Sequence, residues 1–388
     1  MAKAGRPVAL GVALLVQVQV AQAQEFPAPT DRNHTLDVFL GSAIGSARIV
    51  GMGGTAVATA EGSAGVLTNP ASPAVRPATS NDDWDWDWHL DSLVPSFDTD
   101  YDNNGIKTED ESLSVTGGLV VQYRDWGLGF SVLSQSSSND TSSGERFTAT
   151  GLLAKLTLAR SLWRDQLVVG IGVRDLRLTI MGGEQELLSL GGVSAESGVM
   201  WKPQAKSIRV GGSLSLPVIS DDTELQECDP LDCAGYIVPN KAKVPWQATV
   251  GFAHRHAPSA WNTRLKDAQW RDEKALLWAI DAVLTGPTQR GIGIEAFAQH
   301  MVQPSGRTLS LSVRAGAEYE LLPGDLRLRL GSYYEAKRFK DPQGEKIPGR
   351  MHLTGGFQWN LWSFSLWGDK HRLSLSFALD RARDFVNS

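Results

Sequence analysis

The chain has few cysteines, no excess of positive charge and, after its first residues, no long apolar run. Only two cysteines occur in 388 residues, so disulfides cannot be the framework of the fold. The 37 basic and 43 acidic residues give a net charge of −6, which offers no electrostatic footprint for a nucleic-acid partner. No window of about 18 apolar residues follows residue 23, so we expect no transmembrane helix.

Motifs for catalysis are also lacking. The sequence contains seven histidines, but none stands in a recognisable motif with a nucleophile. No G-x-S-x-G elbow occurs either, and that elbow would mark the nucleophile of many hydrolases. We therefore expect a protein that is not an enzyme.

Residues 1–23 have the pattern of a secretory signal peptide. Lys3 and Arg6 form a basic start, an apolar run follows, and residues 21–23 (Ala-Gln-Ala) fit the small-x-small cleavage rule. A membrane anchor is the alternative, but the run is short and interrupted by glutamine. In an exported chain, Cys228 and Cys233 are expected to pair in a local disulfide.

From about residue 114, apolar and polar residues alternate in long segments. In residues 307–320, leucine, valine and tyrosine share one face, and serine, arginine and glutamate share the other. Segments of about ten residues with this dyad repeat are typical of transmembrane β-barrels. A soluble antiparallel sandwich also alternates, but several segments exceed the usual soluble strand of about 5–6 residues. We expect strands at 83–91, 114–123, 126–134, 146–160, 164–180, 188–201, 206–217, 243–255, 273–284, 289–302, 307–320, 325–336, 350–362 and 371–382.

The pattern predicts an all-β fold, a transmembrane antiparallel barrel of about 14 strands spanning residues 81–388. Two stretches add detail to this prediction. Three tryptophans alternate with three aspartates between residues 83 and 88. In a first barrel strand the indoles would face lipid and the carboxylates the interior, where a cation, either Arg48 of the hatch or an arginine of the lumen, is expected to offset them. In 164–180 the apolar face switches near Arg174 and Asp175, and we expect a β-bulge there.

Residues 24–80 are rich in glycine, alanine and serine and have no dyad repeat, so within a barrel they would form an N-terminal hatch. The stretch "SARIVGMGGTAVATAEGSAGVLTNPAS" resembles the N-terminal signature of the FadL-type family of long-chain fatty-acid transporters of the outer membrane. That family has relatives such as the barrel subunit of type IX secretion. The hatch motif that carries the resemblance comprises Gly51, Gly53, Gly54, Asn69, Pro70 and Ala71.

The resemblance implies a 14-stranded barrel in the outer membrane of a Gram-negative bacterium, occluded by the hatch. It further implies transport of hydrophobic small molecules such as long-chain fatty acids, which enter from outside and leave sideways. Some relatives transport nothing, so a docking or assembly component of a secretion or surface complex is the alternative. The expected partners are outer-membrane lipid, a hydrophobic ligand and, for the alternative, a secretion or surface protein. The sequence does not identify the ligand-binding residues.

One acidic stretch has the spacing of a calcium loop, D-x-D-x-N-G-x5-E. Its candidate ligands are Asp100, Asp102, Asn104 and Glu111, and a glycine at 105 permits the sharp turn. The loop is expected between two strands, so it would bind Ca²⁺ in an outer loop without being an EF-hand. A solvated acidic loop is the alternative, and no other cofactor is expected.

Overall fold

The computed structural model describes residues 26–387 apart from 40, 44, 78–79, 81–82, 94–99, 101, 107–110, 141–145, 222–228, 264–269, 367–368 and 384. The expected signal peptide lies outside these residues and stays a prediction. No helix in the described part of the chain is long and apolar enough to cross a membrane.

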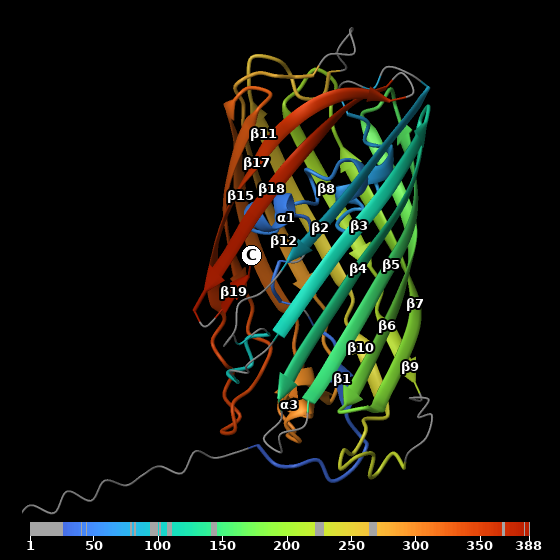
Figure 1. Cartoon of the computed structure of the whole chain (residues 1–388), viewed down its shortest axis with the longest axis vertical. Helices are drawn as coiled ribbons and strands as arrows, with labels where there is room; N and C mark the ends of the chain where they lie inside the picture. Colours follow the sequence, from blue (N-terminus) through green and yellow to red (C-terminus); the bar gives the residue numbers. More distant parts are fainter. Residues whose placement is uncertain are drawn as a thin grey trace, which may run out of the picture.

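One antiparallel sheet of 14 strands forms the wall of the molecule (Figure 1), which confirms the predicted fold class. Strands adjacent in the wall are joined by ladders whose registers run through most of their length. The strands are β2 (Trp84–Leu93), β3 (Glu111–Tyr123), β4 (Trp126–Asp140), β5 (Arg146–Leu162), β6 (Leu167–Gly182), β7 (Gln185–Trp201), β8 (Ile208–Ser215), β11 (Gln247–His256), β12 (Leu276–Thr285), β15 (Ser310–Leu322), β16 (Leu326–Glu335), β17 (Arg350–Leu366), β18 (Asp369–Ala382) and β19 (Phe385–Asn387).

The sheet ends at β2 and at the three-residue strand β19, and in the described part of the chain no ladder joins these two ends. The wall nevertheless curls until β2 approaches β18, where the rings of Trp86 and His371 lie 4.7 Å apart between centroids. We call this boundary between β2 and β18–β19 the seam.

The predicted strand at 289–302 is wrong. These residues form β13 (Gly291–Ile292) and helix α3 (Ile294–Ala298), which precede β14 (Pro304–Ser305). Ile292 and Phe297 are almost fully buried, so this stretch packs into the interior instead of alternating between two faces. Each strand of the wall reverses the chain direction, so without this strand the connection 336–349 lies at the same end of the wall as the other long loops. The connection 257–275 is the long one at the opposite, short-turn end.

The predicted bulge near Arg174 and Asp175 is also wrong. β5 and β6 pair in one unbroken register through these residues, and the register shift of β6 against β7 lies further along, at Ile180 and Met181. The apolar face switches because the surroundings change. Val173 is exposed on the outer face, whereas Leu178 is buried inside.

A second, five-stranded sheet lies at the long-loop end, in the lower part of Figure 1. It contains β1 (Thr35–Asp37), β9 (Val218–Asp221), β10 (Lys241–Val244), β13 and β14. Its residues pack with α3 and the inner faces of β5, β6 and β7 around one apolar core, which includes Leu36, Phe147, Ile180 and Phe297. At its centre Asp37 forms a buried ion pair with Arg338 at 2.9 Å.

The rest of the N-terminal segment contains α1 (Ala47–Gly51), α2 (Gly62–Gly65) and the 3-10 turn η1 (Ser72–Ala74), and its backbone lies directly against glycines of the wall. A Cβ atom added to any of these glycines would come within about 2.2 Å of a backbone carbonyl oxygen, a distance that real Cβ atoms do not reach. The pairs include Gly127 with Pro73, Gly170 with Pro70, Gly211 with Val57 and Gly316 with Met52. Many of the wall glycines therefore serve close packing around the interior.

The outer face of the wall is apolar. Each strand other than β19 exposes at least one large hydrophobic side chain, for example Trp84, Leu119, Phe130, Leu156, Ile171, Val199, Leu214, Val250, Trp278, Val313, Leu330, Leu353 and Phe377. A contiguous apolar surface of this extent is characteristic of contact with lipid. The outer face of the sheet is therefore suited to contact with the lipid of a membrane.

Candidate functional site

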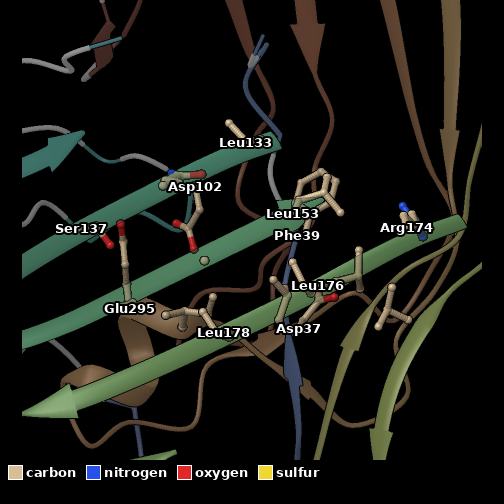
Figure 2. A pocket seen from close by; sticks show the side chains of 17 residues that line it. Asp37, Phe39, Asp102, Leu133, Ser137, Leu153, Arg174, Leu176, Leu178 and Glu295 are labelled. Carbon is tan, nitrogen blue, oxygen red and sulfur yellow. The ribbon is translucent and has the colours of Figure 1, made fainter. Parts of the chain in front are cut away.

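A cavity of ≈170 Å³ lies between the wall and the five-stranded sheet. β4, β5 and β6 line it on one side, and β1, β9, β10 and α3 line it on the other (Figure 2). The side chains in its middle are apolar, among them Leu133, Leu153, Leu176, Leu178 and Phe39. The sequence analysis identified none of these residues as a site.

Among the described residues that line the cavity, one is a cation. Arg174, on the inner face of β6, is only 7% exposed. Its Nε donates to the hydroxyl of Ser194 at 2.7 Å, and its Nη2 donates to the carbonyl of Leu216. Within the described residues it forms no ion pair with a carboxylate. A buried guanidinium that contacts only neutral acceptors is suited to an anionic partner.

Acidic side chains gather at the other end of the cavity (Figure 2). Carboxylate oxygens of Asp100, Asp102 and Glu295 lie within 4.8 Å of one another. Burial and the neighbouring carboxylates of Asp100 and Glu335 raise the pKa of Asp102 well above its usual value. Three clustered carboxylates either share protons or hold a hard cation.

The geometry changes the ligand set of the predicted calcium site. Glu295 of α3 joins the cluster, although it lies far from the loop in sequence. The Asn104 amide donates to Glu295 at 2.7 Å, and its own oxygen accepts from the backbone of Ile106. The Glu111 side chain lies outside the described residues. Calcium binding remains a prediction, now with Asp100, Asp102 and Glu295 as ligands.

The predicted hatch motif lies away from this cavity, against the wall. The Asn69 amide donates to the carbonyls of Val57 at 2.8 Å and Val199 at 3.2 Å, which ties the segment to β7. Gly53 and Gly54 have positive φ angles of 65° and 74°, a region that favours glycine. These residues position the N-terminal segment and do not line the cavity.

The two faces of β2, the strand in which tryptophan and aspartate alternate, have different surroundings. Trp84 and Trp88 are 59% and 54% exposed on the outer face. On the inner face, Asp87 accepts hydrogen bonds from the backbone and hydroxyl of Ser63 in α2, at 2.7 and 2.8 Å. Asp91 accepts from the backbone of Ala47 at the start of α1. Neutral donors of the N-terminal segment thus satisfy carboxylates of β2.

The prediction that Arg48 offsets these carboxylates is wrong. Arg48 pairs instead with Glu318 of β15 at 3.2 Å. A different cation reaches this strand: Arg124 of the β3–β4 turn pairs with Asp83 at 3.2 Å. Because that turn brings Arg124 beside the start of β2, the ion pair is local to the strand ends.

The predicted disulfide lies partly outside the described residues. Cys233 is fully buried in the apolar core at the long-loop end. Cys228 lies outside the described residues, so the pairing remains a prediction.

No known protein family and no curated protein matches the chain in sequence. Solved structures are similar to it in fold. A FadL homologue from Pseudomonas aeruginosa shares 12% identity at a TM-score of 0.55, covering 90% of this chain and 91% of the homologue. The monoaromatic hydrocarbon channel CymD shares 12% at 0.54, covering 90% and 96%. The P. putida toluene transporter TodX shares 14% at 0.52, covering 90% and 97%. These similarities show that the chain has the fold of FadL-type β-barrels, the family that its N-terminal stretch resembles, and its apolar outer face agrees with a place in a membrane.

Proposed function

We propose that the protein takes hydrophobic small molecules with an acidic head group, such as fatty acids, across the outer membrane. The supporting observation is the apolar cavity with Arg174 at one end. An apolar lining favours a hydrocarbon, and a buried guanidinium without a carboxylate favours an anionic head. The acidic cluster at the opposite end favours one orientation, with the head at Arg174.

The cavity size bears on the ligand. An engineered cavity of about 150 Å³ in another protein binds benzene, and this one measures ≈170 Å³. It therefore encloses one ring or a short part of an acyl chain, and the remainder of a long chain would extend beyond it. The solved structures with similar folds include channels named for monoaromatic hydrocarbons, which take ligands of that size.

The position of the cavity agrees with uptake from outside. Bacterial barrels carry their longer loops on the extracellular side, and the cavity lies at the long-loop end, next to the five-stranded sheet. The N-terminal segment packs on wall glycines between this cavity and the short-turn end, so passage straight through the interior would require many contacts to break. We therefore infer a sideways exit at the seam between β2 and β18.

The alternative, a docking component of a secretion or surface complex, receives no comparable support. Residues 218–242 are the expected docking element in that case. Tyr236 and Val238 of this stretch are buried in the core at the long-loop end, and β9 and β10 form part of the inner sheet. These residues face inward, whereas other side chains of the stretch, such as Leu231, are exposed.

A matched pair of ligands tests the proposal. Binding of decanoate and of its uncharged methyl ester is measured by calorimetry on the full chain in detergent. Arg174→Gln is expected to weaken decanoate binding about tenfold, the equivalent of one charge-assisted hydrogen bond, and to leave the ester within about threefold. The nearby buried carboxylate of Glu196 is paired with Lys155 at 2.8 Å, so loss of Arg174 leaves no buried charge without an ion pair.

Arg177→Gln is the control, since Arg177 lies on the same strand but is 73% exposed on the outer face. It is expected to change neither affinity. Equal losses for acid and ester in Arg174→Gln would make that arginine structural. Absence of binding of both ligands to the unaltered protein would overturn the proposed function.

A further inference from the structure

A second cavity, of ≈270 Å³, lies at the short-turn end of the wall, opposite to the first. It is bounded by the N-terminal segment, by residues 261–263 and 270–275 of the connection between β11 and β12, and by the inner faces of β15 and β16. Its lining is charged, whereas the first cavity is apolar. Bacterial barrels carry their short turns on the periplasmic side, so this cavity belongs to the periplasmic end.

Cations outnumber carboxylates around this cavity. Leaving Arg76 aside, seven arginine and lysine side chains and five acidic side chains line it among the described residues. All five carboxylates are already in ion pairs. The pairs are Glu61–Arg209, Asp165–Lys202, Asp272–Arg372, Glu318–Arg48 and Glu320–Arg327.

Two lining cations remain outside these pairs. Arg255 binds Glu273, which lies beside the cavity, at 2.8 Å. Arg271 donates only to neutral oxygens, namely the Ser259 hydroxyl at 2.9 Å and the carbonyls of Ala260 and Thr263. The charges of Glu273 and Glu61 act on it from nearby, but it forms no ion pair with a described carboxylate.

A second positive charge is in excess behind Glu318. Arg48 at 3.2 Å and Arg329 at 2.7 Å share this one carboxylate. The side chain of Arg329 is fully enclosed, and its Nη1 atom has no hydrogen-bond partner among the described residues. One carboxylate cannot neutralise two guanidinium groups, so the interior here lacks an anion.

Two further features indicate a positive, preorganised site. Burial alone would raise the pKa of Glu61, but Arg209, Arg48 and Lys202 outweigh burial and lower it. Two guanidinium groups are held against tryptophan rings that line the cavity. Arg209 lies 3.7 Å from the centroid of Trp261, and Arg372 lies 4.5 Å from that of Trp270, which restricts their orientation.

We propose that this cavity is a binding site for an oxyanion, a carboxylate or phosphate group, entering from the short-turn end. Arginine forks match the geometry of both groups. The anion could come from a dissolved small molecule or from the head group of the transported ligand, and the two sources are separated by the test. The site itself does not depend on the proposed function of the apolar cavity.

Calorimetry on the full chain in detergent, at low ionic strength, tests the site with inorganic phosphate and, separately, with decanoate. Arg271→Gln is expected to weaken phosphate binding about tenfold, and Arg271→Lys to retain most of it. Thr263→Glu adds a carboxylate at the cavity border and is expected to abolish phosphate binding. Arg177→Gln on the outer face is the control and should leave it unchanged.

Both Arg271→Gln and Arg271→Lys remove the guanidinium group, but only Arg271→Gln removes the charge. Thermal unfolding of each variant shows whether it is folded. If phosphate binds and decanoate shows no event that is sensitive to Thr263→Glu, the site serves dissolved anions. If decanoate shows a second event that Thr263→Glu removes, the site receives the ligand head group. Absence of phosphate binding together with absence of such a second event would overturn the site, whatever happens at Arg174.

Discussion

At the scale of single residues, glycine decides how closely the N-terminal segment approaches the wall. The ideal Cβ position at Gly170 lies 2.0 Å from the carbonyl oxygen of Pro70. The clashing atom belongs to backbone, so it cannot move aside like the end of a flexible side chain. The many glycines of the sequence therefore encode contact between two backbones.

Gly170→Ala should consequently destabilise the protein, although alanine normally stabilises a strand relative to glycine. We expect a loss of about 1–3 kcal/mol, the usual cost of overpacking, measured by thermal unfolding in detergent. Gly191→Ala is the control, because a Cβ there meets nothing within 4 Å. Equal stability of the two variants would show that the close approach is not decisive.

At the scale of elements, the loop after β2 and helix α3 together form the acidic end of the ligand cavity. Asp100 accepts from the backbone of Asn104 and Gly105, both at 2.9 Å, so the loop holds one carboxylate in a defined position. α3 supplies Glu295 from a distant part of the chain. A cation bound between them would fasten the loop to the helix.

We therefore expect Ca²⁺ to raise the unfolding temperature of the protein by several degrees, as a ligand that binds only the folded state does. Asp102→Asn should remove this effect, because it takes away one of three carboxylate ligands. Asp229→Asn, in another loop at the same end, should retain it. An unfolding temperature independent of Ca²⁺ would support the solvated acidic loop instead.

At the scale of the whole molecule, the seam is the boundary of the wall at which no ladder joins the described residues of the two strands. Unpaired backbone groups are costly in lipid, so an opening at this boundary is easier than one between strands joined by hydrogen bonds. β2 and β18 already touch through Trp86 and His371. A wall that opens here would release a hydrophobic ligand into the membrane without displacing the N-terminal segment.

A cross-link across the seam tests this exit route. Trp86→Cys with His371→Cys should, once oxidised, reduce uptake of labelled fatty acid to the level of cells without the protein, and reduction should restore uptake. Leu119→Cys with Phe130→Cys is the control, since these exposed residues already face each other across the β3–β4 ladder. Undiminished uptake with the seam locked would exclude it as the exit.

The sequence predicted most of the wall but little of the site. Thirteen of the expected strands overlap observed ones, because side chains alternate with period two on any strand with one lipid face. The strand prediction for 289–302 failed because a short buried apolar stretch has the same sequence pattern in a strand and in a core helix. The switch near Arg174 was visible in the sequence, and it marks the start of the cavity lining, not a bulge.

What the sequence by itself determined is the local pattern: an apolar outer face, an inner face of small and polar residues, and a glycine-rich segment before the first strand. Tertiary structure alone decided what each inner residue meets. Glu295 joins Asp102, Arg48 joins Glu318, and Arg174 forms no ion pair with a described carboxylate. The physical reason is that strand periodicity specifies which face a side chain occupies, whereas its partner across the interior depends on how distant segments pack together.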